Sequence, residues 1–329
     1  MAPTDRVADP EAPISEANCL YKKQCPLYAD PSQDTTKRFE YNWLRGSKTY
    51  GFDSIEDLLN KGTWEQIKGA LAYTGMRYQG DKLVQDVVNL LESWKQLGLT
   101  TGDWTAIEAG PGSGDQLYFL TQYFRRIVGV EFDEQVYKIS VDFRNKLLAC
   151  PAAAPHAAKI DLHCDDICNH VRQHRDEHFL LMSMTMCHLP LEEKWGLIRS
   201  IGESDIKVFV YSCIFAGDGF SGHPDFVGIH LAPVQEHLRR LREVGFVLVS
   251  ATPEKGWREF VKQRYEGFMD PEVQSSFKEA VSSSSYETQL GFFRTIHEAF
   301  ERGMVGATLV LVRESLATEF GLKPVEWQQ

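Results

Sequence analysis

Residues 107–115 form the segment IEAGPGSGD, in which three glycines alternate with other residues between two acids. Glycines at such positions allow the backbone to turn tightly and to approach a ligand closely. Glu108 precedes the turn and Asp115 follows it, so negative charge lies on both sides. Because carboxylates repel a pyrophosphate at this place, the segment favours a ligand whose nearest end is cationic.

Three other kinds of glycine-containing site are alternative interpretations of this segment. A phosphate-binding P-loop ends in Gly-Lys followed by Ser or Thr, whereas the third glycine here is followed by Asp and Gln. A serine nucleophile elbow has a glycine two residues to either side of its serine, but Ser113 has Pro and Asp there. Gly110 and Gly112 match a dinucleotide site, although its third glycine would fall at Asp115. A nucleotide-dependent oxidoreductase using NAD(P) therefore stays as an alternative that the local charge disfavours.

Further acids follow at a spacing that suits a nucleoside. Glu131 lies 21 positions after Gly110, at the end of the second apolar run. A carboxylate at this point can accept the hydrogens of both ribose hydroxyls. Asp165 and Asp166 follow the third apolar run, and residues 179–189 form a fourth run and a loop that ends in His-Leu.

Together these segments resemble the motifs of class I S-adenosylmethionine-dependent methyltransferases, over about residues 103–250 and the last strand. The resemblance implies S-adenosylmethionine as the cofactor, with Glu131 on the ribose and Asp165 receiving the adenine amino group. The cofactor-binding residues that it predicts are Glu108, Gly110, Gly112, Gly114, Glu131, Asp165, Asp166 and Ser183. A second alternative is a non-catalytic module that binds the same cofactor with the same fold.

Methyl transfer from a sulfonium is an in-line displacement, in which alignment and exclusion of water provide most of the catalysis. No covalent nucleophile is required of the protein, and a base helps only when the acceptor carries a proton that must leave. His188 is the predicted base, because its loop should face the transferred methyl group in this fold. Tyr211, Cys213 and His223 are weaker candidates near the end of the fifth run.

Aromatic side chains cluster outside the predicted core, both before it and in residues 252–305. In the family that the chain resembles, such flanking segments commonly build the acceptor pocket. An acidic, aromatic pocket favours a cationic or aromatic small molecule, because the face of a ring attracts an ammonium group. The predicted function is methyl transfer to N, O or S of a small molecule, with an amine or an aromatic acceptor favoured. The residues predicted to contact this acceptor are Tyr41, Trp43, Phe215, Trp257 and Tyr265.

A run rich in histidine and cysteine suggests a zinc site as another use of the chain. His170, His174 and His178 would share one face of a helix, with Cys168 beside them. Their spacing matches no standard zinc finger or metallohydrolase motif, and charged neighbours indicate a surface helix. No metal is therefore predicted.

Short apolar runs alternate with amphipathic helical stretches, and these elements must bring the glycines and acids to one edge. Strand–helix alternation predicts a parallel sheet with helices on both faces. The predicted fold is a three-layer, doubly wound α/β sheet of seven strands, of which the resemblance implies that the last is antiparallel. The seven runs lie at 106–109, 127–130, 160–162, 179–184, 208–211, 246–249 and 308–312.

Two further regions of the chain are predicted to cover this core. The first is a helical N-terminal cap or lid, with its clearest helix at 81–97, and the second is a late helical insertion. The predicted divisions are a disordered tail at 1–16, the cap at 17–100, the core at 101–313 including the insertion at 252–305, and a C-terminal tail at 314–329.

The 329 residues carry 35 Lys and Arg against 46 Asp and Glu, a net charge of −11 that disfavours nucleic acid as a partner. No apolar stretch approaches the ~18 residues of a membrane span, and the N-terminus lacks a signal core. Seven cysteines suit reduced thiols, so we expect a cytoplasmic protein. The expected partner is a small-molecule acceptor, with no nucleic acid and no membrane, and the sequence leaves the oligomeric state open.

Overall fold

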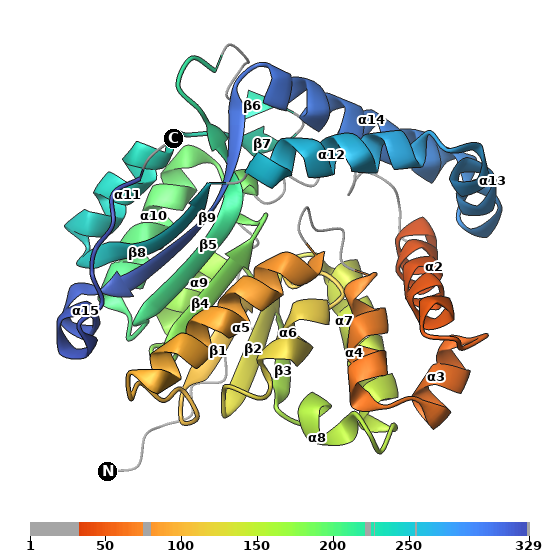
Figure 1. Ribbon diagram of the computed structural model, residues 1–329, viewed down its shortest axis with the longest axis horizontal. Coiled ribbons are helices and arrows are strands. Elements are labelled where there is room, and N and C mark those ends of the chain that lie inside the picture. The colour runs from red at the N-terminus through yellow and green to blue at the C-terminus, as the bar shows by residue number, and fades with distance from the viewer. Residues whose placement is uncertain (1–32, 75–79, 221–224, 227, 254, 328–329) are drawn as a thin grey trace.

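The fold is built on a seven-stranded sheet with the order β3-β2-β1-β4-β5-β9-β8 (Figure 1). The computed structural model describes residues 33–74, 80–220, 225–226, 228–253 and 255–327. β9 is antiparallel to both of its neighbours, and the other strands of the sheet run parallel to one another. Each strand overlaps one of the seven predicted apolar runs, so the predicted doubly wound fold is confirmed. The strands are β1 Thr105–Ala109, β2 Arg126–Glu131, β3 Ile160–Cys164, β4 Phe179–Ser183, β5 Val208–Ala216, β8 Phe246–Pro253 and β9 Met304–Arg313.

Side chains that alternate along the strands fill two cores, one on each face of the sheet. Ile107 and Val128 pair in one core, while their chain neighbours Ala106 and Ile127 pair in the other. This alternation follows from the two-residue period of a strand and makes both faces apolar. The helices over the first core are α9 Ile167–Gln173, α10 Leu191–Glu203 and α11 Val234–Glu243. Those over the second are α5 Gly80–Gln96, α6 Asp115–Leu120, α7 Glu134–Leu148 and α8 Ala154–Ala157.

Local sequence signals set where these helices begin and end. Asp133 starts α7 by accepting the backbone N–H groups of Gln135 and Val136. Gly98 follows α5 and Gly245 follows α11, both with positive φ, as is usual just after a helix. These caps hold the strand–helix connections in place at both edges of the sheet.

The N-terminal cap consists of α2 Gln33–Thr49, α3 Ile55–Lys61 and α4 Trp64–Ala72, together with α5. Ser54 caps α3, and Thr63 forms a capping box with Gln66 at the start of α4. A Cβ on Gly46 would lie 2.4 Å from the Ala70 carbonyl oxygen, so α2 and α4 approach closely there. The predicted tail at 1–16 lies outside the described residues, as does the cap before residue 33.

The late insertion is helical, with α12 Lys255–Phe268, α13 Pro271–Ala280 and α14 Ser283–Glu301. Figure 1 shows α12 and α14 lying across the carboxyl edge of the parallel strands, while α13 reaches toward α2. The Tyr41 hydroxyl on α2 is 2.9 Å from the Ser276 hydroxyl on α13. The two caps, which are distant in sequence, therefore meet on one side of the sheet.

Residues after the sheet form a packed segment. α15 Glu314–Phe320 buries Leu316 and Ala317 against the second core. The Arg313 guanidinium donates hydrogen bonds to backbone carbonyls at the ends of α10 and α11, including those of Ile201 and Val244. Among the described residues, no helix combines the length and apolarity that a membrane crossing requires.

A two-stranded ribbon follows β5 and completes the described strands. It consists of β6 Asp225–Phe226 and β7 Ile229–His230, which pair antiparallel. A short 3₁₀ helix, η1 Met186–His188, follows β4 and contacts β7. The ribbon therefore lies beside the loop that carries the predicted base.

Candidate functional site

The glycine turn, residues 110–114, connects β1 to α6 at the carboxyl edge of the sheet. Gly110, Gly112 and Gly114 have φ values of +63°, +62° and +81°, a conformation that other residues adopt only at a cost. A Cβ on Gly110 would lie 2.7 Å from Thr185 Oγ1, whereas one on Gly112 would have no atom of the described residues within 4 Å. Close packing thus demands a glycine at the first position, while open space adjoins the second.

Glu131 ends β2 beside this turn and is only 4% exposed. Its carboxylate accepts the Gly112 N–H at 3.2 Å through Oε2 and the Asp133 N–H at 3.0 Å through Oε1. Burial raises the pKa of Glu131 to about 7, although these backbone hydrogen bonds favour the ionised form. The structure therefore holds a buried acid with a raised pKa against the turn.

Two more carboxylates lie at the ends of the segment that carries the turn. Glu108 is fully buried within β1, and Asp115 is 3% exposed at the start of α6. The Ser113 hydroxyl donates to Asp115 Oδ1 at 3.3 Å. Negative charge at the first turn of α6 opposes the binding of a phosphate there.

Asp165 and Asp166 are neighbours in the sequence but have different roles in the structure. Asp165 follows β3, and its backbone N–H donates to the Glu131 carbonyl at 3.1 Å, which keeps it beside the end of β2. The Asp166 carboxylate instead caps α9 by accepting the N–H groups of Cys168 and Asn169. Its capping of α9 gives Asp166 a structural role and leaves Asp165 as the better candidate for ligand contact.

The loop after β4 closes the other side of the turn. Ser183, the last residue of β4, is 9% exposed, and Met184 has a φ of +57°, which is unusual for a residue with a side chain. Thr185 Oγ1 donates to the Ala109 carbonyl at 2.7 Å and lies against Gly110. Sequence reasoning included this loop but missed Thr185, because a threonine there carries no distinct chemical signal.

The end of α4 also contacts the glycine turn. The Thr74 hydroxyl is 2.6 Å from the Ser113 hydroxyl, and both side chains are buried. This contact fastens the N-terminal cap to the loop between β1 and α6. Sequence reasoning missed it because the partners are 39 positions apart and belong to different elements.

His188 lies at the end of η1, near the β7 ribbon. Its Nδ1 is 3.1 Å from the Gly228 carbonyl oxygen, a contact in which Nδ1 carries the hydrogen and donates. Burial is the main cause that lowers the pKa of His188 to about 4, so the ring is neutral at neutral pH. In this tautomer Nε2 carries a lone pair and can accept a proton.

The weaker base candidates of the sequence lie deeper in the core. Tyr211 and Cys213 on β5 are at most 1% exposed, and burial raises the pKa of Tyr211 well above its usual value. The Cys213 thiol is hydrogen-bonded to Cys187, whose pKa is raised chiefly by burial. Their burial removes both from contact with a ligand, and His223 lies outside the described residues.

Two of the five predicted acceptor contacts are core residues in the structure. Trp43 is fully buried on α2 with its ring 4.4 Å from that of Phe143 on α7. Phe215 is fully buried on β5, edge-on to Tyr211. Both side chains lie inside the core because their elements pack there, so the described structure leaves neither of them exposed to an acceptor.

The other predicted acceptor contacts belong to the two caps. Tyr41 is half-buried on α2, edge-on to Phe277 of α13 at 5.5 Å. Tyr265 is half-buried on α12, where its hydroxyl accepts from Arg294 Nε at 3.3 Å. The side chain of Trp257 lies outside the described residues.

The histidine-rich segment does not form the helical face that its spacing suggested. α9 ends at Gln173, so His178 lies beyond the helix, where its Nδ1 accepts the Thr105 N–H. His163, from β3, joins His170 and His174 in a cluster of rings instead. No group of three or more His, Cys, Asp or Glu side chains in the described part of the chain is arranged to hold a metal ion.

No protein-family model matches the chain, and the search of curated proteins found no match. Solved structures do match. A sarcosine dimethylglycine methyltransferase, as its description names it, from Galdieria sulphuraria has a TM-score of 0.58 at 11% identity, over 71% of this chain and 85% of that one. A cyclopropane synthase from Mycobacterium tuberculosis has a TM-score of 0.54 at 12% identity, over 69% and 84%.

The Haemonchus contortus phosphoethanolamine N-methyltransferase 2, solved in complex with S-adenosyl-L-methionine, matches with a TM-score of 0.59 at 14% identity. The match covers 93% of this chain but 61% of that enzyme, so the chain spans less than two thirds of its length. At these identities the likenesses show the fold alone. The chain therefore has the class I methyltransferase fold that its motifs predicted.

Proposed function

We propose that the protein is an S-adenosylmethionine-dependent methyltransferase that transfers a methyl group to N, O or S of a small molecule. The observation that carries this proposal is the buried Glu131 carboxylate bonded to the Gly112 N–H at the carboxyl edge of β1 and β2. Ligands of doubly wound sheets bind at this edge, and a carboxylate there suits the two hydroxyls of a ribose. The same fold in solved methyltransferases supports the proposal.

The residues of the turn fit this cofactor better than a dinucleotide. The open space beside Gly112 allows a ligand to approach the backbone, and Asp165 lies next to Glu131 for the adenine amino group. Buried Glu108 and Asp115 favour the ammonium and sulfonium of the cofactor and oppose a pyrophosphate. When bound, the cofactor supplies an activated methyl group on sulfur.

The residues of the chain then have three tasks. The glycine turn and Glu131 orient the donor, because the turn is pinned by Thr74 on one side and by Thr185 on the other. The caps exclude water from the carboxyl edge, which favours an in-line displacement. His188, neutral and with its Nδ1–H bonded to Gly228, accepts a proton at Nε2 when the acceptor must lose one.

The acceptor is proposed to be a small amine or aromatic molecule. Of the predicted acceptor contacts, Tyr41 and Tyr265 are half-buried on the caps, whereas Trp43 and Phe215 are fully buried in the core. Two of the structural neighbours are named for small nitrogen-containing acceptors, sarcosine and phosphoethanolamine. We further propose that the protein acts in the cytoplasm, where the seven cysteines of its sequence stay reduced thiols.

Calorimetry on the purified protein separates the proposal from its alternatives. We expect S-adenosylmethionine and S-adenosylhomocysteine to bind, and NAD(H) and NADP(H) not to bind; tight NAD(P) binding would indicate an oxidoreductase. Incubation with methyl-labelled cofactor and separate metabolite, protein and RNA pools then identifies the acceptor class. Label in protein or RNA alone would overturn the small-molecule assignment, and binding without any transfer would indicate a non-catalytic module.

A further inference from the structure

A pocket lies where α2 meets α12, α13 and α14, and we call it the cap pocket. Its volume is about 170 Å³, which is roughly the space of six waters at about 30 Å³ each. None of its described lining residues belongs to the sheet or to the glycine turn. It is thus a separate site, with room for a small molecule or one functional group.

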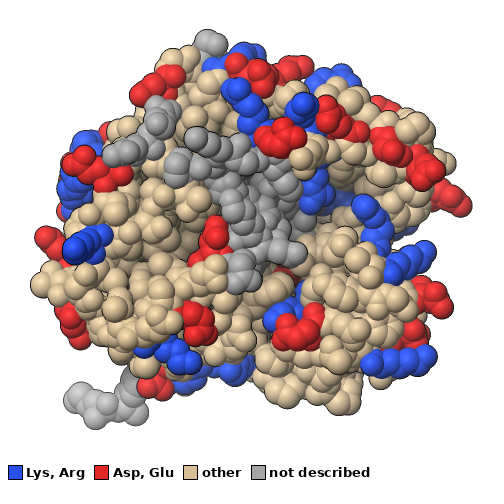
Figure 2. Space-filling view, viewed as in Figure 1, with Lys and Arg blue, Asp and Glu red and all other residues tan. Residues whose placement is uncertain are grey.

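The cap pocket combines an aromatic wall with basic side chains. Phe268, Phe277 and Phe293 come from three different helices and provide flat apolar surface. Arg45 from α2 and Arg264 from α12 also line it, and no Asp or Glu is among its described lining residues. Figure 2 shows Lys and Arg side chains beside the hollow at the right-hand edge, where α2 meets the late insertion. In a chain of net charge −11, such a local excess of positive charge favours an anion.

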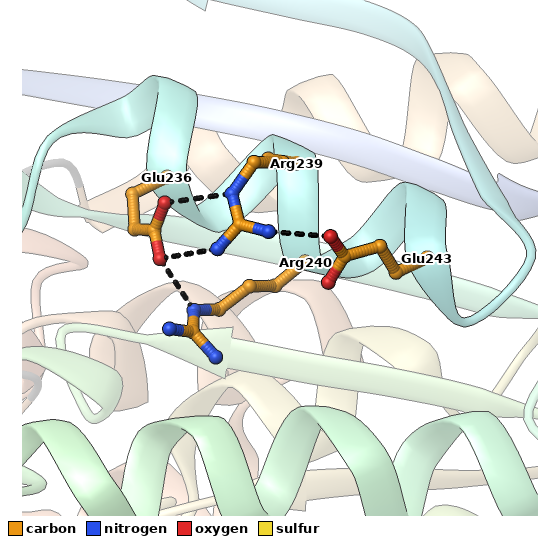
Figure 3. A network of polar contacts seen from close by, with 4 residues as sticks. All are labelled: Glu236, Arg239, Arg240 and Glu243. Carbon is orange, nitrogen blue, oxygen red and sulfur yellow. Dashed lines mark hydrogen bonds and ion pairs between the residues drawn. The ribbon is translucent and has the colours of Figure 1, made fainter.

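Arginines elsewhere on the surface are arranged differently. On α11, Arg239 bonds to both Glu236 and Glu243, and Arg240 also bonds to Glu236 (Figure 3). Arg45, by contrast, forms no ion pair with any carboxylate in the described part of the chain and is placed over the Tyr41 ring. Its charge therefore remains available to a ligand.

A buried amide in the same wall provides independent evidence for a ligand. Gln289 of α14 is 3% exposed, and its Nε2 has no hydrogen-bond partner among the described residues. A buried donor without a partner destabilises a protein, because it has lost its water and gained nothing. An acceptor oxygen in the cap pocket would satisfy this donor.

We propose that the cap pocket binds the oxyanion group of a small organic molecule, a carboxylate or a phosphate monoester. Arg45, Arg264 and Gln289 donate hydrogen bonds to the oxyanion, since charged donors and a planar guanidinium suit this geometry. The three phenyl rings pack against the carbon body of the ligand. This inference rests on the pocket alone and does not depend on methyl transfer or on the cofactor.

Isothermal titration of the full-length protein with phenyl phosphate tests the proposal, since this probe has both an oxyanion and an aromatic body. We expect saturable binding and a rise in the melting midpoint, because a ligand of the native state stabilises it. Benzyl alcohol, which lacks the oxyanion, and benzamidine, which is cationic, should not bind. Inorganic phosphate should bind more weakly. Failure of phenyl phosphate to bind at millimolar concentration, or equal affinity for inorganic phosphate, would overturn the proposal.

Three variants locate the binding, and a fourth serves as a control. Arg45→Gln and Arg264→Gln should each weaken phenyl phosphate binding roughly tenfold, as loss of one charged hydrogen bond does. Gln289→Leu should weaken binding too, yet raise the melting midpoint of the free protein, because it removes the unpartnered donor. Arg242→Gln, at an exposed position of α11, should change neither the affinity for phenyl phosphate nor the melting midpoint. Unchanged affinity in all three pocket variants would place the probe elsewhere and refute the site.

Discussion

Gly112 and Glu131, which bond at the glycine turn, are 19 positions apart, whereas Tyr41 and Ser276, which bond next to the cap pocket, are 235 positions apart. The turn is assembled from two consecutive strand–helix units, whose register is set by the sheet. The cap pocket is assembled from the first described helix and the last insertion, whose meeting depends on how both pack over the sheet.

This difference determines which features of each region are visible in the sequence. At the turn, each requirement applies to one residue type at one position: a glycine at positive φ, an acid at a strand end. At the cap pocket, an arginine such as Arg45 or an amide such as Gln289 is an ordinary helix residue, and its role arises only from its distant neighbours. Substitutions in the two regions should therefore differ in kind as well as in size.

The largest effect is expected at Gly110. Gly110→Ala adds a Cβ at 2.7 Å from Thr185 Oγ1 at a positive φ, so overlap of about 1–3 kcal/mol adds to about 1–2 kcal/mol of backbone cost. Gly112→Ala, its matched control, carries only the backbone cost because its Cβ meets no atom of the described residues within 4 Å. Urea unfolding of both variants measures the difference. Equal free energies of unfolding would show that Thr185 does not restrict the turn.

His188 should give the next largest effect, in turnover. His188→Gln should lower the rate at saturating cofactor by about 100-fold, because a general base contributes about that much. Cofactor affinity should change little. Since burial lowers the pKa of His188 to about 4, the rate of the wild-type protein should show no loss from His188 protonation between pH 8 and pH 5. A rate that the substitution leaves intact would exclude His188 as the base.

Glu131 should affect cofactor binding and its pH dependence. Glu131→Gln should weaken S-adenosylmethionine binding by about 1–3 kcal/mol, because the amide lacks the charge and one of the two acceptor oxygens. Burial raises the pKa of Glu131 from 4.5 to about 7, so affinity for this cation should rise as the pH increases through 7.

The same raised pKa makes a prediction for the free protein. Folding disfavours the ionised Glu131, so its contribution to stability is present below pH 4.5 and is lost as the pH rises through 7. Glu131→Gln should flatten both pH profiles, measured by calorimetry and by urea unfolding. Parallel profiles in the two proteins would mean that another group titrates.

The smallest effect is expected between the caps. Tyr41→Phe removes the hydroxyl contact with Ser276 and should cost about 0.5–1.5 kcal/mol, because one partly exposed hydrogen bond is lost while the ring packing on Phe277 remains. Hydrogen exchange should quicken in α2 and α13 but not in α6. Faster exchange at the glycine turn as well would show that the two regions are energetically coupled.

The strands and the turn could be predicted because their determinants are local. Apolar runs of three to six residues indicate buried strands, and the positions of Gly110 and Glu131 follow directly from them. The aromatic residues could not be assigned in this way. Trp43 and Tyr41 lie two positions apart on α2, yet one faces α7 in the core and the other faces α13.

The helical face proposed for the histidines was also wrong for a local reason that only the structure reveals. α9 ends at Gln173, so the expected i, i+4, i+8 series is broken and His163 of β3 takes the third place in the cluster. A helix that ends one turn early has the same residue spacing in the sequence as one that continues.

From the sequence alone came the seven-stranded α/β fold, the glycine turn and the acids that surround it, because backbone conformation and strand periodicity constrain residue types at single positions. The tertiary structure decided the rest. It buried Trp43 and Phe215, turned Asp166 into a helix cap, set Thr74 and Thr185 against the turn, and brought Arg45 to Arg264 and Gln289. Thr74 and Thr185 reach the turn across 39 and 76 positions, and Arg45 lies more than 200 positions from Arg264 and Gln289. Contacts between such distant positions depend on how the elements pack, and no local pattern encodes them.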